Sequence, residues 1–254
     1  MNKNGVAVTT AEALLGNNSY YLELLDSVKT LESNLAKELS TARAGSGESD
    51  AIGQKVFNVE MLGTHPTFNI EDVFARFALQ NEILGIANRY LRMYTSLRYY
   101  NVWHTFATDS AARESQLWHK DREDFHILKL FLYISDVDEN AGPFNYVPGT
   151  HPKGDRKQVA PTFLEGNVER SNDEQMAEVI PEKVWKQCTG KRGTIIFADT
   201  RGYHKGGFAR EQDRIMYTAM FTSPASESEK LLRRSGAMPQ QMTRDMQYAL
   251  KGAF

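Results

Sequence analysis

Apolar residues recur at helical spacing through the first third of the chain. Over residues 19–42, the positions that fall on one face of a 3.6-residue helix are apolar, which predicts an amphipathic helix. These positions are Tyr21, Leu22, Leu25, Val28, Leu31 and Leu35. The Gly/Ser-rich stretch over 42–53 predicts a loop after this helix. A second helix is predicted over 68–94, with Asn69 as its N-cap.

After residue 94 the pattern changes to short runs of β-branched and aromatic residues, separated by Gly, Pro, Asn and Asp. These runs cover residues 96–107, 128–135, 144–149, 193–199 and 214–222. Such a series of short strands is typical of an antiparallel sandwich or barrel. The polar insert from residue 153 to about residue 190 is expected to form a lid or a surface excursion, with a helix over 173–179.

Neither an internal repeat nor a clear linker divides the sequence, so we expect one domain over residues 1–254. We expect this domain to have a helical N-terminal part over about 1–94, a barrel core over about 95–224 and a helical tail over about 225–254. The expected fold is therefore mainly β, with flanking helices at both ends.

Composition describes an ordinary globular protein, with 41% hydrophobic and 24% charged residues among 254. The net charge of −2 gives no broad basic surface, so neither nucleic acid nor an anionic membrane is an expected partner. The single cysteine, Cys188, excludes an internal disulfide and fits a reducing compartment. The sequence shows neither a signal-like N-terminal run nor a transmembrane-length apolar run, so we expect a cytoplasmic location.

Candidate metal ligands occur near the middle of the chain, in the stretch SQLWHKD. His119 and Asp121 are separated by one residue, so on an extended strand their side chains point to the same side. His204 lies far downstream, at the end of another strand-like run, and an antiparallel barrel allows the two segments to be neighbours. Two histidines and one carboxylate on one face, with three open positions, form the ligand set of non-haem Fe(II) oxygenases.

Arg214 adds a second feature, because it follows His204 and opens the predicted strand over 214–222. A planar guanidinium near a metal suits a dicarboxylate co-substrate, since it matches a carboxylate with two hydrogen bonds. An HxD pair alone also arises by chance, and a lone Arg is more often a surface residue. The ordered set of HxD, distant His and strand-opening Arg is much more specific.

Three segments resemble the phytanoyl-CoA dioxygenase-like branch of the Fe(II)/2-oxoglutarate-dependent oxygenases. They are SQLWHKD, KLFLYISDVDENAGPFNYVPGTH, and GTIIFADTRGYHKGG followed by DRIMYTAMF. The resemblance covers roughly residues 96–224. It implies a double-stranded β-helix, also called a jelly-roll or cupin-like barrel, with N-terminal and C-terminal helices.

The resemblance also implies roles for individual residues. His119, Asp121 and His204 correspond to the iron ligands, and Arg214 corresponds to the partner of the distal carboxylate of 2-oxoglutarate. Lys129 occupies a place where related enzymes often have a polar co-substrate contact. The chain departs from the family pattern two residues after the arginine, where many relatives have a hydroxyl residue and this chain has Met216. Thr218, on the same strand face, is the candidate substitute.

The implied reaction is oxidation, most simply hydroxylation, of a C–H bond in a small metabolite. O2 is consumed, and 2-oxoglutarate is decarboxylated to succinate and CO2. Asp121 favours hydroxylation over halogenation, because halogenating relatives have a small residue at this position. Arg201 is a candidate contact for an anionic substrate group, with a salt bridge to a neighbouring acid as the alternative. Gln116 faces either the substrate cavity or solvent.

Two other functions are compatible with the same barrel. A cupin-like isomerase or dioxygenase that does not use 2-oxoglutarate would commonly bind its metal with three or four histidines and would not need Arg214. A binding protein without turnover would not need a complete ligand set. The sequence indicates neither the substrate nor the oligomeric state.

Overall fold

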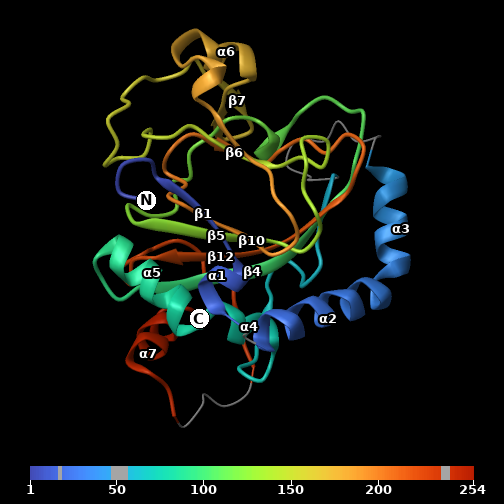
Figure 1. Ribbon diagram of the computed structural model, residues 1–254, viewed down its shortest axis with the longest axis vertical. Helices are drawn as coiled ribbons and strands as arrows, with labels where there is room; N and C mark the ends of the chain where they lie inside the picture. The colour runs from blue at the N-terminus through green and yellow to red at the C-terminus, as the bar shows by residue number, and fades with distance from the viewer. Residues whose placement is uncertain (17–18, 47–56, 236–240) are drawn as a thin grey trace.

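A six-stranded antiparallel sheet forms the centre of the computed structural model (Figure 1), which describes residues 1–16, 19–46, 57–235 and 241–254. The strand order is β1-β10-β5-β12-β4-β2. In that order the bounds are Val6–Thr10, Thr194–Ala198, Ile127–Tyr133, Arg214–Thr222, Ser96–Thr105 and Asn58–Glu60. The strands β4, β10 and β12 lie within the runs that the sequence predicts as strands, and β5 begins one residue before its predicted run.

A three-stranded sheet, β11-β6-β9, faces the large sheet. It consists of β11 (His204–Lys205), β6 (Phe144–Tyr146) and β9 (Lys186–Cys188). A buried cluster of apolar side chains from both sheets fills the space between them. It includes Phe131, Tyr133, Phe144, Tyr146, Ile196 and Met216. The two facing sheets confirm the expected jelly roll.

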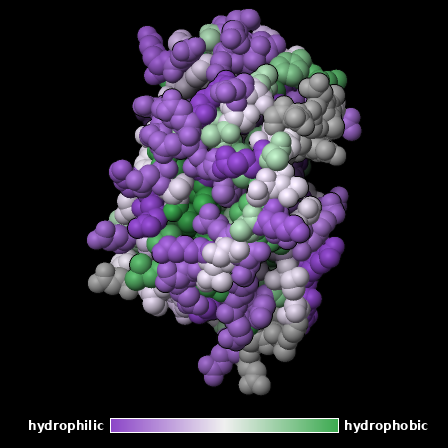
Figure 2. Space-filling view, turned by 90° about the vertical axis from the view of Figure 1, so that its right-hand side faces the viewer, coloured by the Kyte–Doolittle hydropathy of each residue, from purple (hydrophilic) through white to green (hydrophobic). Residues whose placement is uncertain are grey.

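Helices cover the opposite face of the large sheet, below it in Figure 1. They are α2 (Ser19–Asn34), α4 (Val73–Ala78), α5 (Asn81–Leu91) and α7 (Arg244–Lys251). Side chains alternate between the two faces of a strand, so each strand contributes to the core on both sides of the sheet. In β5, Leu128, Leu130 and Leu132 face the helices, whereas Phe131 and Tyr133 pack between the two sheets. Figure 2 shows one side of the molecule, mostly hydrophilic with a recessed hydrophobic area.

The predicted N-terminal helices are each divided in two. The first consists of α2 and α3 (Ala36–Gly45), with Leu35 at the break. The second begins later than predicted, because Asp72 and not Asn69 caps α4: Asp72 Oδ1 accepts a hydrogen bond from the Phe74 amide over 3.0 Å. Extended backbone at Gln80 then separates α4 from α5. The predicted cap at Asn69 is therefore wrong.

The N-terminal part also contains strands that the prediction of a helical region over 1–94 omitted. The β-branched run VAVTT forms β1, which pairs with β10 at the edge of the large sheet. It is followed by a short helix, α1 (Ala11–Leu15). Further on, β2 extends the other edge, and β3 (Thr67–Phe68) pairs in parallel with β13 (Arg233–Arg234).

The insert after residue 153 contains a hairpin of β7 (Phe163–Glu165) and β8 (Val168–Arg170). The predicted helix over 173–179 is confirmed as α6 (Asp173–Val179). Two 3₁₀ turns, η1 (Glu114–Gln116) and η2 (Glu182–Val184), complete the elements.

In the C-terminal tail, α7 is the one helix among the described residues. Most of the predicted loop over 42–53 lies outside the described residues. No helix in the described part of the chain is sufficiently long and apolar to span a membrane.

Candidate metal centre

Backbone hydrogen bonds hold two of the predicted ligands opposite each other. His119 lies in an extended segment just after η1, and His204 begins β11. The His119 amide donates to the His204 carbonyl over 3.0 Å, and the His204 amide donates to the His119 carbonyl over 3.1 Å. Asp121 is fixed beside them, because its amide donates to the Thr200 carbonyl over 2.8 Å. This short antiparallel pairing brings together side chains that are far apart in the sequence.

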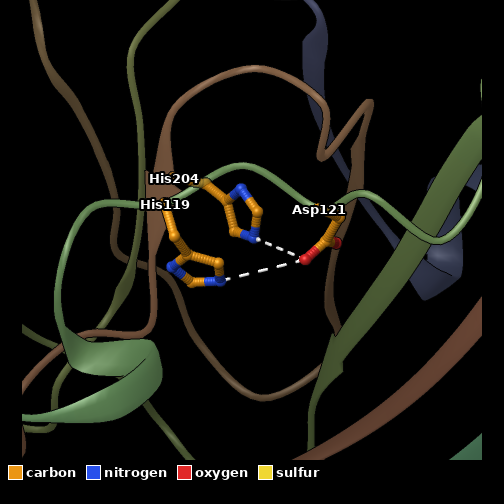
Figure 3. A group of neighbouring side chains, drawn as sticks. All are labelled: His119, Asp121 and His204. Atoms are coloured by element: carbon orange, nitrogen blue, oxygen red, sulfur yellow. Dashed lines mark ion pairs between the residues drawn. The ribbon is translucent and has the colours of Figure 1, made fainter. Parts of the chain in front are cut away.

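The three side chains point toward one another (Figure 3), with one potential ligand atom from each within 4.8 Å of the others. Asp121 Oδ1 is 3.9 Å from His119 Nε2 and 3.7 Å from His204 Nε2. The Nδ1 atoms of the two rings face backbone carbonyls, Leu117 O at 2.8 Å and Gly202 O at 3.0 Å. Because a carbonyl can only accept, each Nδ1 carries the proton and each Nε2 presents its lone pair to the centre.

The charges of this group follow from burial and from Lys129. Burial lowers the pKa of His119 well below its usual range, and the neighbouring His204 lowers it further. Burial also lowers the pKa of His204, so both imidazoles are neutral near pH 7, the form that binds a metal. Burial opposes ionisation of Asp121, but the Lys129 ammonium holds the pKa of that carboxyl below its usual range.

The donor set fits a divalent iron ion. Two neutral imidazoles and one ionised carboxylate converge from one side, which leaves the other positions of an octahedral ion open. Structural zinc sites instead use four ligands and are rich in thiolates, and the single cysteine is not part of this group. The arrangement therefore matches a catalytic ferrous centre better than a structural metal site.

A cavity of about 110 Å³ adjoins the ligands on the inner face of β12. Arg214 and Thr218 both line it, because residues at even spacing on a strand face the same side. Arg214 is buried, and it donates from Nη2 to Thr105 Oγ1 over 3.2 Å and from Nη1 to the Gly142 carbonyl. Burial lowers its pKa, and within the described residues no acid forms an ion pair with it. The cavity thus contains a buried cation without a counter-charge among the described residues.

A larger cavity of about 540 Å³ is lined by His119 and Asp121 and extends to the β7–β8 hairpin. Its wall combines the aromatic residues Tyr99 and Trp103 with the charged residues Glu60, Lys120 and Arg170. Tyr99 and Trp103 also line the smaller cavity, so the two spaces meet beside His119.

Sequence reasoning did not identify these wall residues. Alternation along the predicted strand over 96–107 places Tyr99 and Trp103 on one face. That signal does not say which face is turned toward the ligands, since both faces of the strand are buried. Glu60 carried no signal, because its strand was not predicted.

The two predicted substrate contacts have partners within the protein. Arg201 donates to Asp199 Oδ1 from Nε over 2.9 Å and to Asp199 Oδ2 from Nη2 over 2.6 Å. It borders a third cavity, of about 900 Å³, whose lining includes Asp121 and which shares Lys120 with the 540 Å³ cavity. Gln116 is buried in η1, where its Oε1 accepts from the Arg113 amide over 3.2 Å. The residues that line the 110 Å³ and 540 Å³ cavities include neither Arg201 nor Gln116 in the described part of the chain.

Several solved structures share this fold. EctD from S. alaskensis with bound Fe aligns over 98% of this chain and 80% of its own, with a TM-score of 0.58 and 14% identity. HygX from Streptomyces hygroscopicus, solved with nickel and 2-oxoglutarate, aligns over 87% of this chain and 84% of its own, with a TM-score of 0.55 and 15% identity. SnoK, a non-heme alpha-ketoglutarate-dependent carbocyclase from nogalamycin biosynthesis, aligns over 89% of this chain and 83% of its own, with a TM-score of 0.56 and 17% identity. At such identities the likeness shows the fold alone.

Fold and site together define a jelly-roll protein with a candidate His-Asp-His metal centre. The family model of phytanoyl-CoA dioxygenase matches residues 22–214, most of the sequence. The chain belongs to the phytanoyl-CoA dioxygenase family, which confirms the family expected from the motifs and, with it, an Fe(II)- and 2-oxoglutarate-dependent oxygenase. None of the curated proteins with which the sequence was compared matches it significantly.

Proposed function

We propose that this protein is a non-haem Fe(II)/2-oxoglutarate-dependent dioxygenase that hydroxylates an unactivated C–H bond of a small metabolite. His119, Asp121 and His204 hold the iron, and residues 1–254 act as one oxygenase domain. The observation that carries the proposal is the convergence of these three side chains, with both Nε2 atoms and one carboxylate oxygen facing one point. Bound Fe(II) supplies the redox centre at which O2 is activated as 2-oxoglutarate is decarboxylated to succinate and CO2.

Arg214 is the proposed partner of the distal carboxylate of 2-oxoglutarate. Support comes from its burial in the cavity beside the ligands without a protein counter-charge. A buried cation of this kind is stabilised when an anion enters, and a carboxylate matches the guanidinium geometry. Thr218, on the same face of β12, is positioned to add a hydroxyl contact. Such contacts orient the co-substrate and keep water out of the cavity.

The larger cavity is the proposed substrate site. Its mixture of aromatic and charged walls suits a small polar molecule better than a long aliphatic chain. Structures of this fold have been solved with small molecules, EctD with 5-hydroxyectoine and HygX with hygromycin B. Asp121 occupies the carboxylate position, and we therefore assign hydroxylation and not halogenation. The single cysteine supports a cytoplasmic location.

Arg201 has a structural role in this proposal. Its guanidinium is engaged by the buried carboxylate of Asp199, which also accepts a hydrogen bond from the Tyr90 hydroxyl over 2.8 Å. A substrate anion would have to compete with that carboxylate. The alternative functions are a metalloenzyme that does not use 2-oxoglutarate and a binding protein. Neither supplies an anion that would neutralise the buried charge of Arg214.

Anaerobic titration of the Fe(II)-loaded protein with 2-oxoglutarate tests the proposal. Chelation of ferrous iron by the 2-oxo acid is expected to give a visible charge-transfer band that saturates at one equivalent per chain. Arg214→Met is expected to weaken 2-oxoglutarate binding by at least about 10-fold, because a charge-assisted pair contributes about 1.5–3 kcal/mol.

Arg192→Met is the matched control, since it removes an exposed arginine that lies outside the cavity. We expect its 2-oxoglutarate titration to be that of the unsubstituted protein. An iron-loaded protein that shows no band on addition of 2-oxoglutarate would exclude the proposed co-substrate and favour a metalloenzyme of another kind.

A further inference from the structure

Lys129 reaches from the large sheet to the metal centre. It lies in the middle of the sheet on β5, where its neighbours across the two ladders are Ala198 and Met220. Its side chain, only 13% exposed, lines both cavities and ends 2.6 Å from Asp121 Oδ2. Within the described residues, Asp121 is the one acid with which Lys129 forms an ion pair.

The two carboxylate oxygens of Asp121 consequently have different surroundings. Oδ1 faces the two histidines, at 3.9 Å from one Nε2 and 3.7 Å from the other. Oδ2 is turned away from them and contacts the Lys129 ammonium. The Asp121 side chain is only 8% exposed, so water does not compete strongly for either oxygen. A partial rotation that brought both oxygens toward the histidines would move Oδ2 away from Lys129 and break the buried ion pair.

We propose that Lys129 is a positioning residue that occupies Oδ2 and thereby makes Asp121 a one-oxygen ligand. This inference rests on the proposed function, since it needs the metal that His119, Asp121 and His204 hold. It replaces the direct co-substrate contact that the sequence suggested for Lys129. A carboxylate that is free to use both oxygens would occupy a fourth position on an octahedral ion. With Oδ2 occupied, three positions stay open for co-substrate and O2.

Positioning and charge make different predictions when Lys129 is replaced. Removing a nearby positive charge strengthens the attraction of the site for a divalent ion in either case. The number of open coordination positions on the metal changes on this substitution only if Lys129 determines whether Asp121 binds the metal through one oxygen or two. A measurement of that number, made without 2-oxoglutarate, therefore separates positioning from a charge effect and from a co-substrate contact.

The test uses the full chain loaded with Mn(II), a paramagnetic substitute for Fe(II), and counts bound waters by water relaxation. The unsubstituted protein is expected to hold about three waters on the metal, the positions left open by a facial set of three ligands. Lys129→Met is expected to hold about two and to bind Mn(II) at least about 10-fold more tightly, because both oxygens then contact the metal. Lys129→Arg restores about three, since its guanidinium can also occupy Oδ2.

Lys191→Met is the matched control. Lys191 pairs with Asp136 over 2.9 Å on the surface, where its side chain is 88% exposed, so its removal is expected to leave the water count unchanged. An unchanged count in Lys129→Met overturns the inference, whether Mn(II) or 2-oxoglutarate affinity changes or not. A count of about two in the unsubstituted protein also overturns it, even when the Lys129 variant fails to fold. Failure of the unsubstituted protein to bind any divalent metal contradicts the proposed function itself.

Discussion

At the scale of single residues, local contacts prepare the metal centre before any metal binds. The carbonyls of Leu117 and Gly202 fix the proton of each histidine on Nδ1, and burial keeps both rings neutral. Such contacts to the outer nitrogen orient a histidine ligand and determine which tautomer is present. The centre therefore requires little rearrangement to accept an ion.

Asp121→Ala tests the contribution of the carboxylate to turnover. Loss of one of three ligands weakens metal binding and removes the negative charge that faces the ion, so we expect substrate-dependent succinate formation to be abolished. The measurement is the release of succinate in the presence of a substrate that the unsubstituted protein turns over. Asp136→Ala, at an exposed acid that pairs with Lys191, is the control and is expected to retain activity. Near-full turnover in the Asp121 variant would remove Asp121 from the proposed ligand set.

Residue identity predicted the donors better than their partners. The HxD spacing, the distant histidine and Arg214 were sufficient to select the four side chains that the structure places at the ligands or the adjoining cavity. The contact of Lys129 with Asp121 was not predicted, whereas a salt bridge of Arg201 to a neighbouring acid was one of two alternatives. The first contact depends on how β5 packs against the segment that contains Asp121, and the second on side-chain conformation in the loop after β10. Spacing along the chain contains neither.

At the scale of elements, the central strands of the large sheet were predicted more accurately than the N-terminal helices. The run over 214–222 became β12 with the same bounds, because β-branched and aromatic residues between turn residues are a strong local signal. The helical run over 68–94 did not show its internal break, since apolar spacing continues through Gln80. In the same way, β1 was too short and too close to the N-terminus for its alternation to stand out.

The corrected start of α4 gives a prediction about stability. Asp72→Ala removes a side-chain acceptor for the Phe74 amide and is expected to lower the free energy of unfolding by about 1 kcal/mol. Asn69→Ala removes only a turn contact to the Glu71 amide and is expected to have an effect below about 0.5 kcal/mol. Denaturant unfolding of both variants is the measurement. A larger loss in the Asn69 variant would contradict the assignment of the cap.

At the scale of the whole molecule, the jelly roll explains how distant segments form one centre. The large sheet carries Lys129 and Arg214, whereas His204 lies in β11, and His119 and Asp121 lie in the segment that pairs with it. Helices under the sheet bury its outer face and so fix the inner face as the wall of the site. Sequence patterns predicted this class of fold, but the relative placement of the segments follows from packing between sheets.

The most direct test of the account is to locate iron in the protein. Crystals of the Fe(II)-loaded chain, prepared without oxygen, would be measured on both sides of the iron absorption edge. We predict one anomalous peak per chain, within bonding distance of His119 Nε2, His204 Nε2 and one oxygen of Asp121. A peak at another group of residues, or imidazoles of residues 119 and 204 too far apart to share one ion, would contradict the account.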